Sequence, residues 1–432
     1  MGRNDEPPLA SWECTYPLAR SGYPYISAQC ERLGTNLFRS RLMFKKTLFM
    51  RGEEAAELFY DDARFSRENA APTRLKKTLF GEGGIQGLEG EAHHQRKALF
   101  LSLMSQSRID ELMQLVEQHW QLRLNYWEAQ ASITLLDELH HILCRAACAW
   151  CGIPLHNVDA PEMAEQLVLM IEGGAAIGPK HWASRRARRQ TENALLDLIK
   201  QYRQGLHEVD PVLPFATFVD FRDAQGKPLP NRIVAVELLN IIRPIVAVAR
   251  YMVFAVLAIH EHPDCYEKLK HQGSSHYRRH FIQEVRRYYP FFPFLAARVN
   301  ADFTWQGYRF KRGRQAILDL YGTNHDAHRW EAPDQFYPER FEQEEVDLHR
   351  FAMIPQGGSD HATQHRCPGE WITLALIDLA IEKFIHQLRY DVPCQDLTVD
   401  LNVIPARPRS GFIISNIHSI NSSQPSAEEE HF

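Results

Sequence analysis

A long apolar tract from Ile233 to Ile259 limits the fold of this chain more than any other feature. The tract is long enough to cross a bilayer, but it contains Glu237, Arg243, Pro244 and Arg250. Charged side chains are costly at bilayer depth, so we expect a buried helix of a soluble protein and no membrane span. A chain of 432 residues, of which 44% are hydrophobic, can bury such a helix without disulfides or structural metals.

Helical periodicity dominates the rest of the sequence, because apolar residues recur at spacings of three and four. The segments with this pattern are Ile109–Trp127, Leu135–Trp150, Thr191–Leu206 and Trp371–Leu388. Strand patterns are short, at Phe303–Phe310, Ala316–Leu320 and, more weakly, Leu397–Ile414, and the polar segment Asp210–Asn231 is expected to be a loop. We therefore predict a mainly α fold with a minor β region, built as one domain over residues 1–420 and followed by a disordered tail at 421–432.

Charge and cysteine content exclude several classes of protein. The 49 basic and 54 acidic residues leave a net charge of −5, which argues against a nucleic-acid-binding protein. The first residues lack the apolar segment of a signal peptide, and the eight cysteines lack the paired spacing of a disulfide scaffold. We therefore expect a cytoplasmic protein. We interpret Cys144, Cys148 and Cys151 as small core residues and the run Arg185–Arg189 as a solvated helix face.

A single cysteine stands directly before an apolar helix, in the loop from Pro355 to Glu370. The helix dipole and the neighbouring His365 and Arg366 would all favour the thiolate form of Cys367. Spacing alone leaves a second interpretation open, in which Cys367 is an inert buried residue at the start of the helix.

Two further motifs bear on this choice. Glu284 and Arg287 lie three residues apart on one face of a predicted helix, and the segment Pro338–Phe341 adds Arg340 about fifty residues later. Together with the cysteine loop, and in this order, these motifs resemble the cytochrome P-450 family over most of the chain. The resemblance implies the P-450 fold and a haem b cofactor, with Cys367 as the thiolate ligand of the iron. It also implies that the glutamate and the two arginines form the structural triad of the family.

The same resemblance assigns residues to the haem propionates. His365 lies two residues before the cysteine, where the family places a propionate partner. In the segment Gly90–Lys97, His93 and Lys97 match the spacing of two further propionate-binding residues, and Arg96 is a rival for that role. A thiolate ligand would push electron density onto the iron and favour cleavage of a bound O–O bond.

The central tract departs from the monooxygenases of the family, which carry an acid–threonine pair that protonates iron-bound dioxygen. Arg243 and Pro244 stand in place of that pair. Pro244 cannot donate a hydrogen bond to the carbonyl of Asn240, so we expect a local kink in the helix. Asp360 and Thr363 replace the usual phenylalanine and glycine of the cysteine loop, which puts in doubt the surface where electron-transfer partners dock.

Arg243 needs a partner, because an uncompensated buried charge destabilises a protein by about 3–5 kcal/mol. Glu237 lies on a different helix face and is a poor local partner. One interpretation pairs Arg243 with a distant carboxylate or a haem propionate. The other pairs it with the carboxylate of a bound ligand, held by a forked charge-assisted contact. Arg250 is a rival anchor for the same ligand group.

The Arg-Pro pair, the lengthened glycine loop and the segment Arg366–Trp371 together resemble the bacterial fatty acid peroxygenase branch of the family. In that branch hydrogen peroxide replaces dioxygen, reductant and electron-transfer partner, and the substrate carboxylate carries the peroxide proton. The resemblance implies that Arg243 binds a long-chain fatty acid and, with Pro244, belongs to the catalytic site. It also implies a hydrophobic wall for the acyl chain, formed by Phe291, Phe292 and Phe294.

The expected position of oxidation follows from the anchor at Arg243. A carboxylate held there would bring the α and β carbons closest to the iron. Relatives that favour decarboxylation carry a histidine where the segment Gly83–Gly87 places Gln86, and a neutral amide cannot donate a proton as imidazolium can. We therefore expect 2- and 3-hydroxy fatty acids, with terminal alkene as a minor product, unless Gln86 only packs near the haem.

Three other functions remain open at this point: an alkene-forming fatty acid decarboxylase, a monooxygenase that depends on a redox partner, and a haem-thiolate sensing protein without turnover. The missing acid–threonine pair counts against the second of these, and the arginine inside the central helix favours an enzyme over a sensor.

Overall fold

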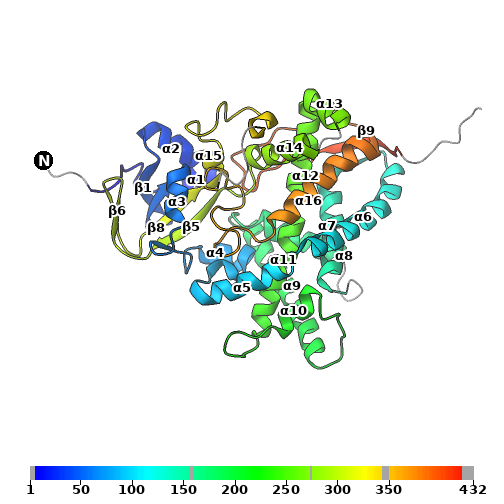
Figure 1. Cartoon of the computed structure of the whole chain (residues 1–432), viewed down its shortest axis with the longest axis horizontal. Coiled ribbons are helices and arrows are strands. Elements are labelled where there is room, and N and C mark those ends of the chain that lie inside the picture. Colours follow the sequence, from blue (N-terminus) through cyan, green and yellow to red (C-terminus); the bar gives the residue numbers. More distant parts are fainter. Residues whose placement is uncertain (1–4, 155–159, 273–274, 343–349, 421–432) are drawn as a thin grey trace, which may run out of the picture.

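Helices make up most of the computed structural model, which describes residues 5–154, 160–272, 275–342 and 350–420 (Figure 1). The longer helices are α5 (Gly90–Ser102), α6 (Gln106–Glu128), α7 (Leu135–Cys151), α8 (Ala160–Glu172), α9 (Pro179–Arg203), α11 (Asn231–Ala247), α12 (Ala249–Glu261), α14 (Ser275–Tyr288) and α16 (Glu370–Glu382). The shorter helices are α1 (Thr15–Ser21), α2 (Tyr25–Leu33), α3 (Glu53–Phe59), α4 (Thr73–Leu75), α10 (Pro214–Asp220), α13 (Pro263–Gln272) and α15 (Leu320–Asn324). The predicted mainly α class is confirmed, whereas the predicted tail at 421–432 lies outside the described residues.

The minor β region consists of three separate sheets. The largest has the strand order β1 (Leu37–Leu42), β2 (Lys45–Met50), β8 (Gln315–Asp319), β5 (Phe294–Val299) and β3 (Phe65–Ser66). Strands β2 and β8 run parallel, and the other neighbours run antiparallel. The second sheet contains β4 (Ser132–Thr134), β10 (Ile413–Ser419) and β9 (Leu388–Asp391), and the third is the hairpin of β6 (Phe303–Trp305) and β7 (Tyr308–Phe310). Figure 1 shows the five-stranded sheet at one end of the long axis and the helices at the other.

Several predicted segments differ from the observed elements in their bounds. Helices α6 and α7 agree with prediction within a few residues, but α9 begins well before Thr191 and ends before Leu206. Helix α10 lies inside the segment predicted to be a loop, because Pro214 starts a short helix whose apolar residues are buried. The helix predicted to reach Leu388 changes to a π-helical turn at Lys383–Gln387, after which β9 begins.

The central apolar tract forms α11 and α12, which are buried along almost their whole length. The helix continues through Pro244 and is interrupted only at Val248, whose N–H lies 3.2 Å from the carbonyl oxygen of Pro244 and 3.1 Å from that of Ile245. The break in the helix therefore lies about one turn after the proline at which we expect a kink. The stretch Asn231–Glu261 is long and apolar enough to span a membrane by composition, but 89% of its most apolar window is buried inside the protein.

Packing around this tract forms the main hydrophobic core, to which α6, α7, α8, α11, α12 and α16 contribute. Cys144, Cys148 and Cys151 are buried in this core, as predicted. A second cluster fills the space between the five-stranded sheet and α3. The central helix therefore runs through the interior with side chains of many elements around it, and polar groups on it are far from bulk water.

Candidate active site

The cysteine loop is held in place by α14 and α16. The backbone N–H of Cys367 donates to the carbonyl oxygen of Gln356 at 3.0 Å, which closes the loop on itself. Arg286 of α14 donates to the side-chain oxygen of Gln356 at 3.1 Å and pairs with Glu370 at 2.5 Å. Glu370 also accepts from Arg366 at 2.6 Å, so the first residue of α16 joins two arginines. These contacts fix the sulfur of Cys367 just before the start of α16.

Burial raises the pKa of the Cys367 thiol, and this effect exceeds the lowering by the Gly369 N–H and by the positive charges of Lys97 and Arg286. The helix start favours the thiolate as expected, through the Gly369 N–H, but burial outweighs this effect in the free thiol. Arg366, also expected to favour the thiolate, is paired with Glu370. A metal ion bound directly to the sulfur would nevertheless deprotonate it.

Glu284, Arg287 and Arg340 meet in one buried cluster. Both oxygens of Glu284 accept from Arg287, at 2.7 and 2.8 Å, and Arg340 approaches Glu284 to 3.1 Å. Arg287 also donates to the carbonyl oxygens of Asn324 and Gln335. The cluster joins α14 to the segments that precede the cysteine loop, which is the structural role expected for these three residues.

The residues predicted to bind propionates lie together on α5 and the cysteine loop. His93 stacks on His365 with ring centroids 3.9 Å apart, and burial lowers the pKa of His93 to about 3, with further lowering by His365 and Lys97. Lys97 is buried and donates to the backbone carbonyl of Arg366. The Nε2 of His365 faces the carboxylate of Glu89 at 3.8 Å, longer than an ordinary hydrogen bond.

Arg96 points away from this group. Its Nη1 forms an ion pair with Glu237 of α11 at 2.5 Å, and Glu237 is completely buried. Glu237 neutralises the charge of Arg96, so Arg96 is a weaker candidate for a haem propionate than an unpaired arginine would be.

Arg243 lies on the buried face of α11 without a carboxylate partner in the described part of the chain. Its contact within the protein is a hydrogen bond from Nη2 to Oδ1 of Asn240 at 3.3 Å, and its Nε has no acceptor among the described residues. Burial lowers the pKa of Arg243 to about 9; the positive charge of Arg188 lowers it further, and the charge of Cys367 opposes the change. Arg243 and Cys367 therefore lie close enough for one charge to act on the other.

Arg250, the rival anchor, occupies a different environment. It pairs with Glu172 of α8, whose carboxylate neutralises its charge. Arg188 and Arg96 are neutralised in the same way, by Glu192 at 2.7 Å and by Glu237. The contrast with these three arginines leaves Arg243 as the better candidate for a ligand carboxylate.

A chain of amide and carboxylate contacts connects Arg243 to Gln86. Nδ2 of Asn240 donates to Oε2 of Glu237 at 2.9 Å and to Oε1 of Gln86 at 3.3 Å. Glu237 thus reaches Arg243 only through Asn240, which the sequence interpretation did not use. Glu237, Asn240 and Arg243 are spaced by three residues, and this spacing was the available signal for one polar stripe along the helix.

Comparisons with known proteins agree with this geometry. A sequence profile of the cytochrome P-450 family matches residues 257–404. Among curated proteins, (+)-menthofuran synthase of Mentha piperita is 30% identical over 142 residues, which are 32% of this chain and 27% of that protein. The match thus spans about a quarter of the length of such relatives.

Solved structures match nearly the whole chain. Cytochrome P450SP alpha (CYP152B1) in complex with (R)-ibuprofen is 43% identical, with a TM-score of 0.91 and coverage of 94% of this chain and 99% of that one. The chain belongs to the cytochrome P-450 family. Cytochrome P450EX alpha (CYP152N1) with myristic acid is 39% identical, and ligand-free P-450 OleT is 34% identical. Each match covers 96% of this chain and 99% of the other chain, with a TM-score of 0.92 for P450EX alpha and 0.91 for OleT. These matches place the protein beside the CYP152 members of the P-450 family.

The residues of this P-450 fit the haem cofactor of its family. Cys367 would supply the sulfur ligand of the iron, and His93, His365 and Lys97 would bind the propionates. The buried Arg243 Nε has no acceptor among the described residues and marks a place where an anionic group of a cofactor or ligand would be satisfied.

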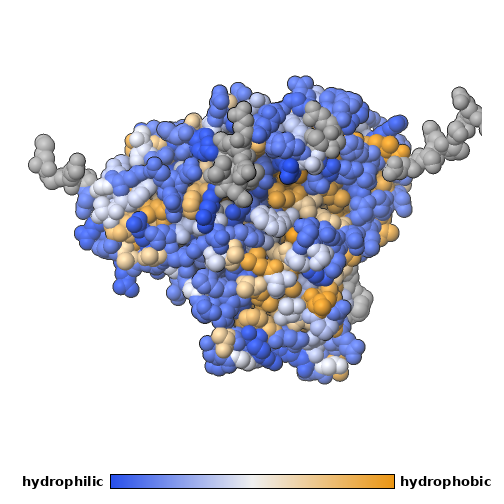
Figure 2. All heavy atoms as spheres, viewed as in Figure 1, coloured by the Kyte–Doolittle hydropathy of each residue, from blue (hydrophilic) through white to orange (hydrophobic). Residues whose placement is uncertain are grey.

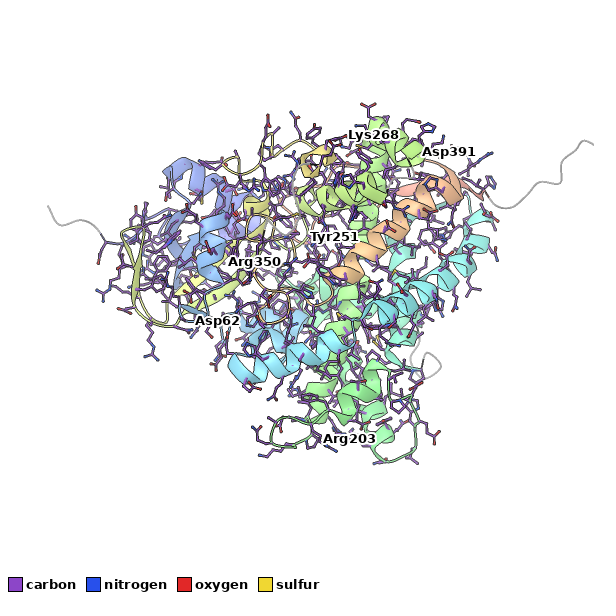
Figure 3. All side chains as sticks on the ribbon, viewed as in Figure 1. Asp62, Arg203, Tyr251, Lys268, Arg350 and Asp391 are labelled. Atoms are coloured by element: carbon purple, nitrogen blue, oxygen red, sulfur yellow. The ribbon has the colours of Figure 1, made fainter. Side chains whose placement is uncertain are left out.

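The predicted phenylalanine wall is not a single surface. Phe291 stacks on Tyr251 of α12 with ring centroids 4.3 Å apart and belongs to the main core, and Figure 3 shows Tyr251 near the centre of the molecule. Phe292 packs into the cluster beneath the sheet and approaches Phe80 to 6.3 Å, whereas Phe294 begins β5 and packs toward the N-terminal helices. Phe291 and Phe292 precede β5, which begins at Phe294, so their side chains do not follow the alternation of the strand.

Proposed function

We propose that this protein is a haem b peroxygenase that uses hydrogen peroxide to hydroxylate long-chain fatty acids at the α and β carbons. Arg243 carries the proposal, because it is a buried guanidinium that has a free Nε and no carboxylate partner in the described chain. A buried charge of this kind is costly unless a ligand of opposite charge compensates it. A fatty acid provides that charge as a carboxylate, and a guanidinium can hold a carboxylate by two parallel hydrogen bonds.

Bound haem, held by Cys367 and by propionate contacts with His93, Lys97 and His365, would supply an iron centre that accepts one oxygen atom from the peroxide. Arg243 then binds and orients the fatty acid carboxylate beside that centre. The carboxylate accepts the proton of the peroxide and returns it to the departing oxygen, which leaves as water. The reaction needs neither an electron-transfer partner nor an acid–threonine pair.

Gln86 has an orienting role in this proposal. Its Oε1 accepts a hydrogen bond from Asn240, so its amide N–H groups are free to hold a water or a peroxide oxygen. Pro244 removes one N–H donor from the helix next to Arg243, which keeps the backbone at this position from forming a regular helical hydrogen bond. Of the three predicted wall residues, Phe291 and Phe292 are the ones we expect to line the acyl chain, on either side of the segment that leads into β5.

A basic cleft supports a route for an anionic substrate. The cleft has a volume of about 240 Å³ and lies between η1 (Lys76–Phe80) and α9. Six cations line it, together with the carboxylates Glu82 and Glu192, which pair with Arg232 and Arg188: the cations are Lys76, Lys77, Arg185, Arg188, Arg189 and Arg232. Arg188 is buried, contrary to the predicted solvated helix face, and its charge also acts on Arg243. The cleft therefore has an excess of positive charge, six cations against two carboxylates, on the side of Arg243 where Arg188 lies.

The relatives give independent support for an acidic ligand. One solved P450EX alpha structure contains myristic acid, and one P450SP alpha structure contains (R)-ibuprofen. Both molecules are carboxylic acids.

The test combines purified holoprotein, myristic acid and hydrogen peroxide without any reductase, and analyses the products by mass spectrometry. We expect 2- and 3-hydroxymyristic acid as main products and terminal alkene as a minor one. Myristic acid methyl ester is the matched control, because it lacks the carboxylate. It should not react until a short carboxylic acid is added.

Four results would contradict the proposal. Turnover that requires NADPH, a reductase and ferredoxin would indicate a redox-partner-dependent monooxygenase. Mainly terminal alkene would indicate a decarboxylase, and oxidation near the methyl end would exclude Arg243 as the anchor. Binding of myristic acid without turnover under either condition would indicate a haem-thiolate sensing protein.

A further inference from the structure

The turn between β1 and β2 holds two exposed hydrophobic residues in a strained conformation. Strands β1 and β2 pair up to Leu42 and Lys45, so Met43 and Phe44 alone form the two-residue turn. Both have positive φ, 53° and 63°, which is the conformation usually supplied by Asn-Gly in such turns. Bulky side chains rarely adopt it, and a non-glycine residue held there is strained.

The surrounding chain holds this turn in place. The N–H of Phe44 donates to Oε2 of Glu13 at 3.0 Å, and the N–H of Met43 donates to Oγ1 of Thr15 at 2.5 Å. The Phe44 side chain is nevertheless 74% exposed, and so its ring contributes little to the core. Specific contacts thus maintain a strained backbone at a position where the side chain does not stabilise the fold. Such strain indicates a functional role for the turn.

Other exposed aromatic side chains lie beside this turn. The ring of Trp12 contacts that of Phe44 edge to face at 6.3 Å, and Arg41 covers the Trp12 ring at 4.5 Å. Trp12 is 61% exposed, and Leu9 and Tyr16 on the same N-terminal segment are also exposed. We call Leu9, Trp12, Tyr16, Met43 and Phe44 the apolar tip. Figure 2 shows hydrophobic residues among the hydrophilic surface of the sheet end of the molecule.

A strongly basic cleft opens at the same end of the sheet. It has a volume of about 360 Å³, and its charged lining residues are Lys45, Lys46, Arg298, Lys311, Arg312 and Arg314. Strands β2 and β8 run parallel and both begin here, while β1 and β5 end here, so the cleft and the apolar tip share one end of the sheet. Arg314 is 9% exposed and pairs with Glu6 at 2.9 Å through Nη2, but its Nη1 has no acceptor among the described residues.

We propose that this end of the molecule binds the surface of an anionic lipid bilayer, with the apolar tip inserted at the interface and lipid phosphates in the basic cleft. Aromatic side chains prefer the headgroup region of a bilayer, and clustered lysines and arginines are attracted to anionic lipids. The chain as a whole has a net charge of −5, so this cluster opposes the overall sign. The proposal goes beyond the proposed function and does not depend on it.

A second copy of the chain is a poorer occupant. A symmetric dimer through this face would place the six cations of one cleft against the same six of the other. A soluble phosphate could fill the cleft, but it would give no role to the exposed rings of Trp12 and Phe44.

The experiment measures cosedimentation of holoprotein with phosphatidylcholine vesicles that contain either no anionic lipid or one third phosphatidylglycerol. We expect binding to the anionic vesicles only, and we expect it to weaken as the salt concentration rises. The double variant Met43→Asn/Phe44→Gly introduces the usual residues of this turn. It should have a higher Tm than the wild type, because strain is relieved, and yet bind vesicles about tenfold more weakly.

Charge variants test the cleft separately. Lys45→Ser/Lys46→Ser/Arg312→Ser should weaken binding by roughly fivefold for each cation removed. Matched controls lie far from the sheet. They are Leu206→Asn, next to the end of α9 near Arg203, and Lys200→Ser/Lys270→Ser on α9 and α13 (Figure 3). These controls should retain full vesicle binding.

Four outcomes would overturn the proposal. Equal binding to neutral and anionic vesicles would contradict the role of the basic cleft. Wild-type binding by the turn variant would contradict the role of the apolar tip. Saturable binding of inorganic phosphate without vesicle binding would reduce the cleft to a site for soluble anions. Self-association that disappears in the turn variant, without vesicle binding, would make this face a contact between copies of the chain.

Discussion

At the scale of single residues, the uncompensated charge of Arg243 gives the clearest prediction. Arg243→Ala removes the proposed partner of the fatty acid carboxylate, and loss of one partner of a buried charge pair costs roughly 2–5 kcal/mol, or about one and a half to four decades in affinity. The measurement is the dissociation constant of myristic acid from the change in the haem spectrum. Arg250→Gln is the comparison, because Arg250 is paired with Glu172. Unchanged affinity in Arg243→Ala, with weakened affinity in Arg250→Gln, would move the anchor to Arg250.

Gln86 gives a second prediction at this scale, on product identity. Gln86→His places a group that can donate a proton beside Asn240, at the position where neutral glutamine can only hold a water or a peroxide oxygen. We expect the share of terminal alkene to rise severalfold and to rise further as the pH falls below the pKa of the histidine. The products are quantified by mass spectrometry at pH 6 and pH 8. Gln86→Asn is the control, because it keeps an amide and should keep hydroxy acids as the main products.

Sequence reasoning located the residues whose chemistry is unusual, and missed those that hold them. Cys367 and Arg243 were found because a lone cysteine before a helix and a charge inside an apolar tract are rare. Asn240 and Arg286 were missed because an asparagine on a helix and one of two adjacent arginines are common, and only the fold shows what they contact. The effect of burial on the pKa of Cys367 was missed for the same reason, since burial depends on the packing of distant segments.

At the scale of secondary-structure elements, the cluster on α14 is expected to decide whether the cysteine loop is positioned. Glu284→Ala leaves Arg287 and Arg340 without their shared carboxylate, and breaking a buried pair of this kind costs about 3–5 kcal/mol. We expect a large fall in unfolding free energy and a lower haem content per chain. Asp302→Ala is the matched control, because its pair with Arg309 is about half exposed and exposed pairs contribute about 0–1 kcal/mol. Equal losses in the two variants would contradict the role of the cluster.

Helices with a strong apolar periodicity were predicted well. Strands that form only by pairing with distant segments of the chain were not. Helices α6 and α7 carry a continuous apolar stripe that buries against the main core, and their predicted bounds hold. Strands β1 and β2 were not predicted, because their apolar pattern is interrupted by Arg39, Arg41, Lys45 and Lys46. Their pairing with each other and with β8 is a long-range contact that local sequence does not report.

At the scale of the whole molecule, charge is distributed unevenly in a way that the net charge of −5 conceals. Two clefts are lined mainly by cations, one next to Arg188 and one at the end of the five-stranded sheet. The composition argued only against a nucleic-acid-binding protein, because a sum over the chain carries no information about where charges gather. Placement depends on which loops the sheet and helices bring together, and this is a property of the fold.

The stability of the whole molecule should also depend on pH through Asp319. Burial raises the pKa of this carboxyl to about 7, although it accepts hydrogen bonds from the N–H of Gly322 and the hydroxyl of Ser27. The unfolded chain would titrate near 3.9, so between these values the folded state holds a proton that the unfolded state releases. The stabilisation from this group is therefore complete below about pH 4 and is lost as the pH rises to about 7, by at most about 4 kcal/mol.

Asp319→Asn tests this linkage, because the asparagine oxygen can still accept from the N–H of Gly322 and its NH2 group can donate to the Ser27 hydroxyl oxygen, without a charge to desolvate. We expect the variant to lose less unfolding free energy than the wild type between pH 4 and pH 7, and to be the more stable protein at pH 8. The measurement is urea unfolding of the holoprotein across this range. Asp197→Asn, an exposed carboxylate on α9, controls for the change in net charge and should follow the wild type. Parallel curves for Asp319→Asn and the wild type would show that the buried carboxyl is ionised throughout, and that hydrogen bonds from Gly322 and Ser27 offset its burial.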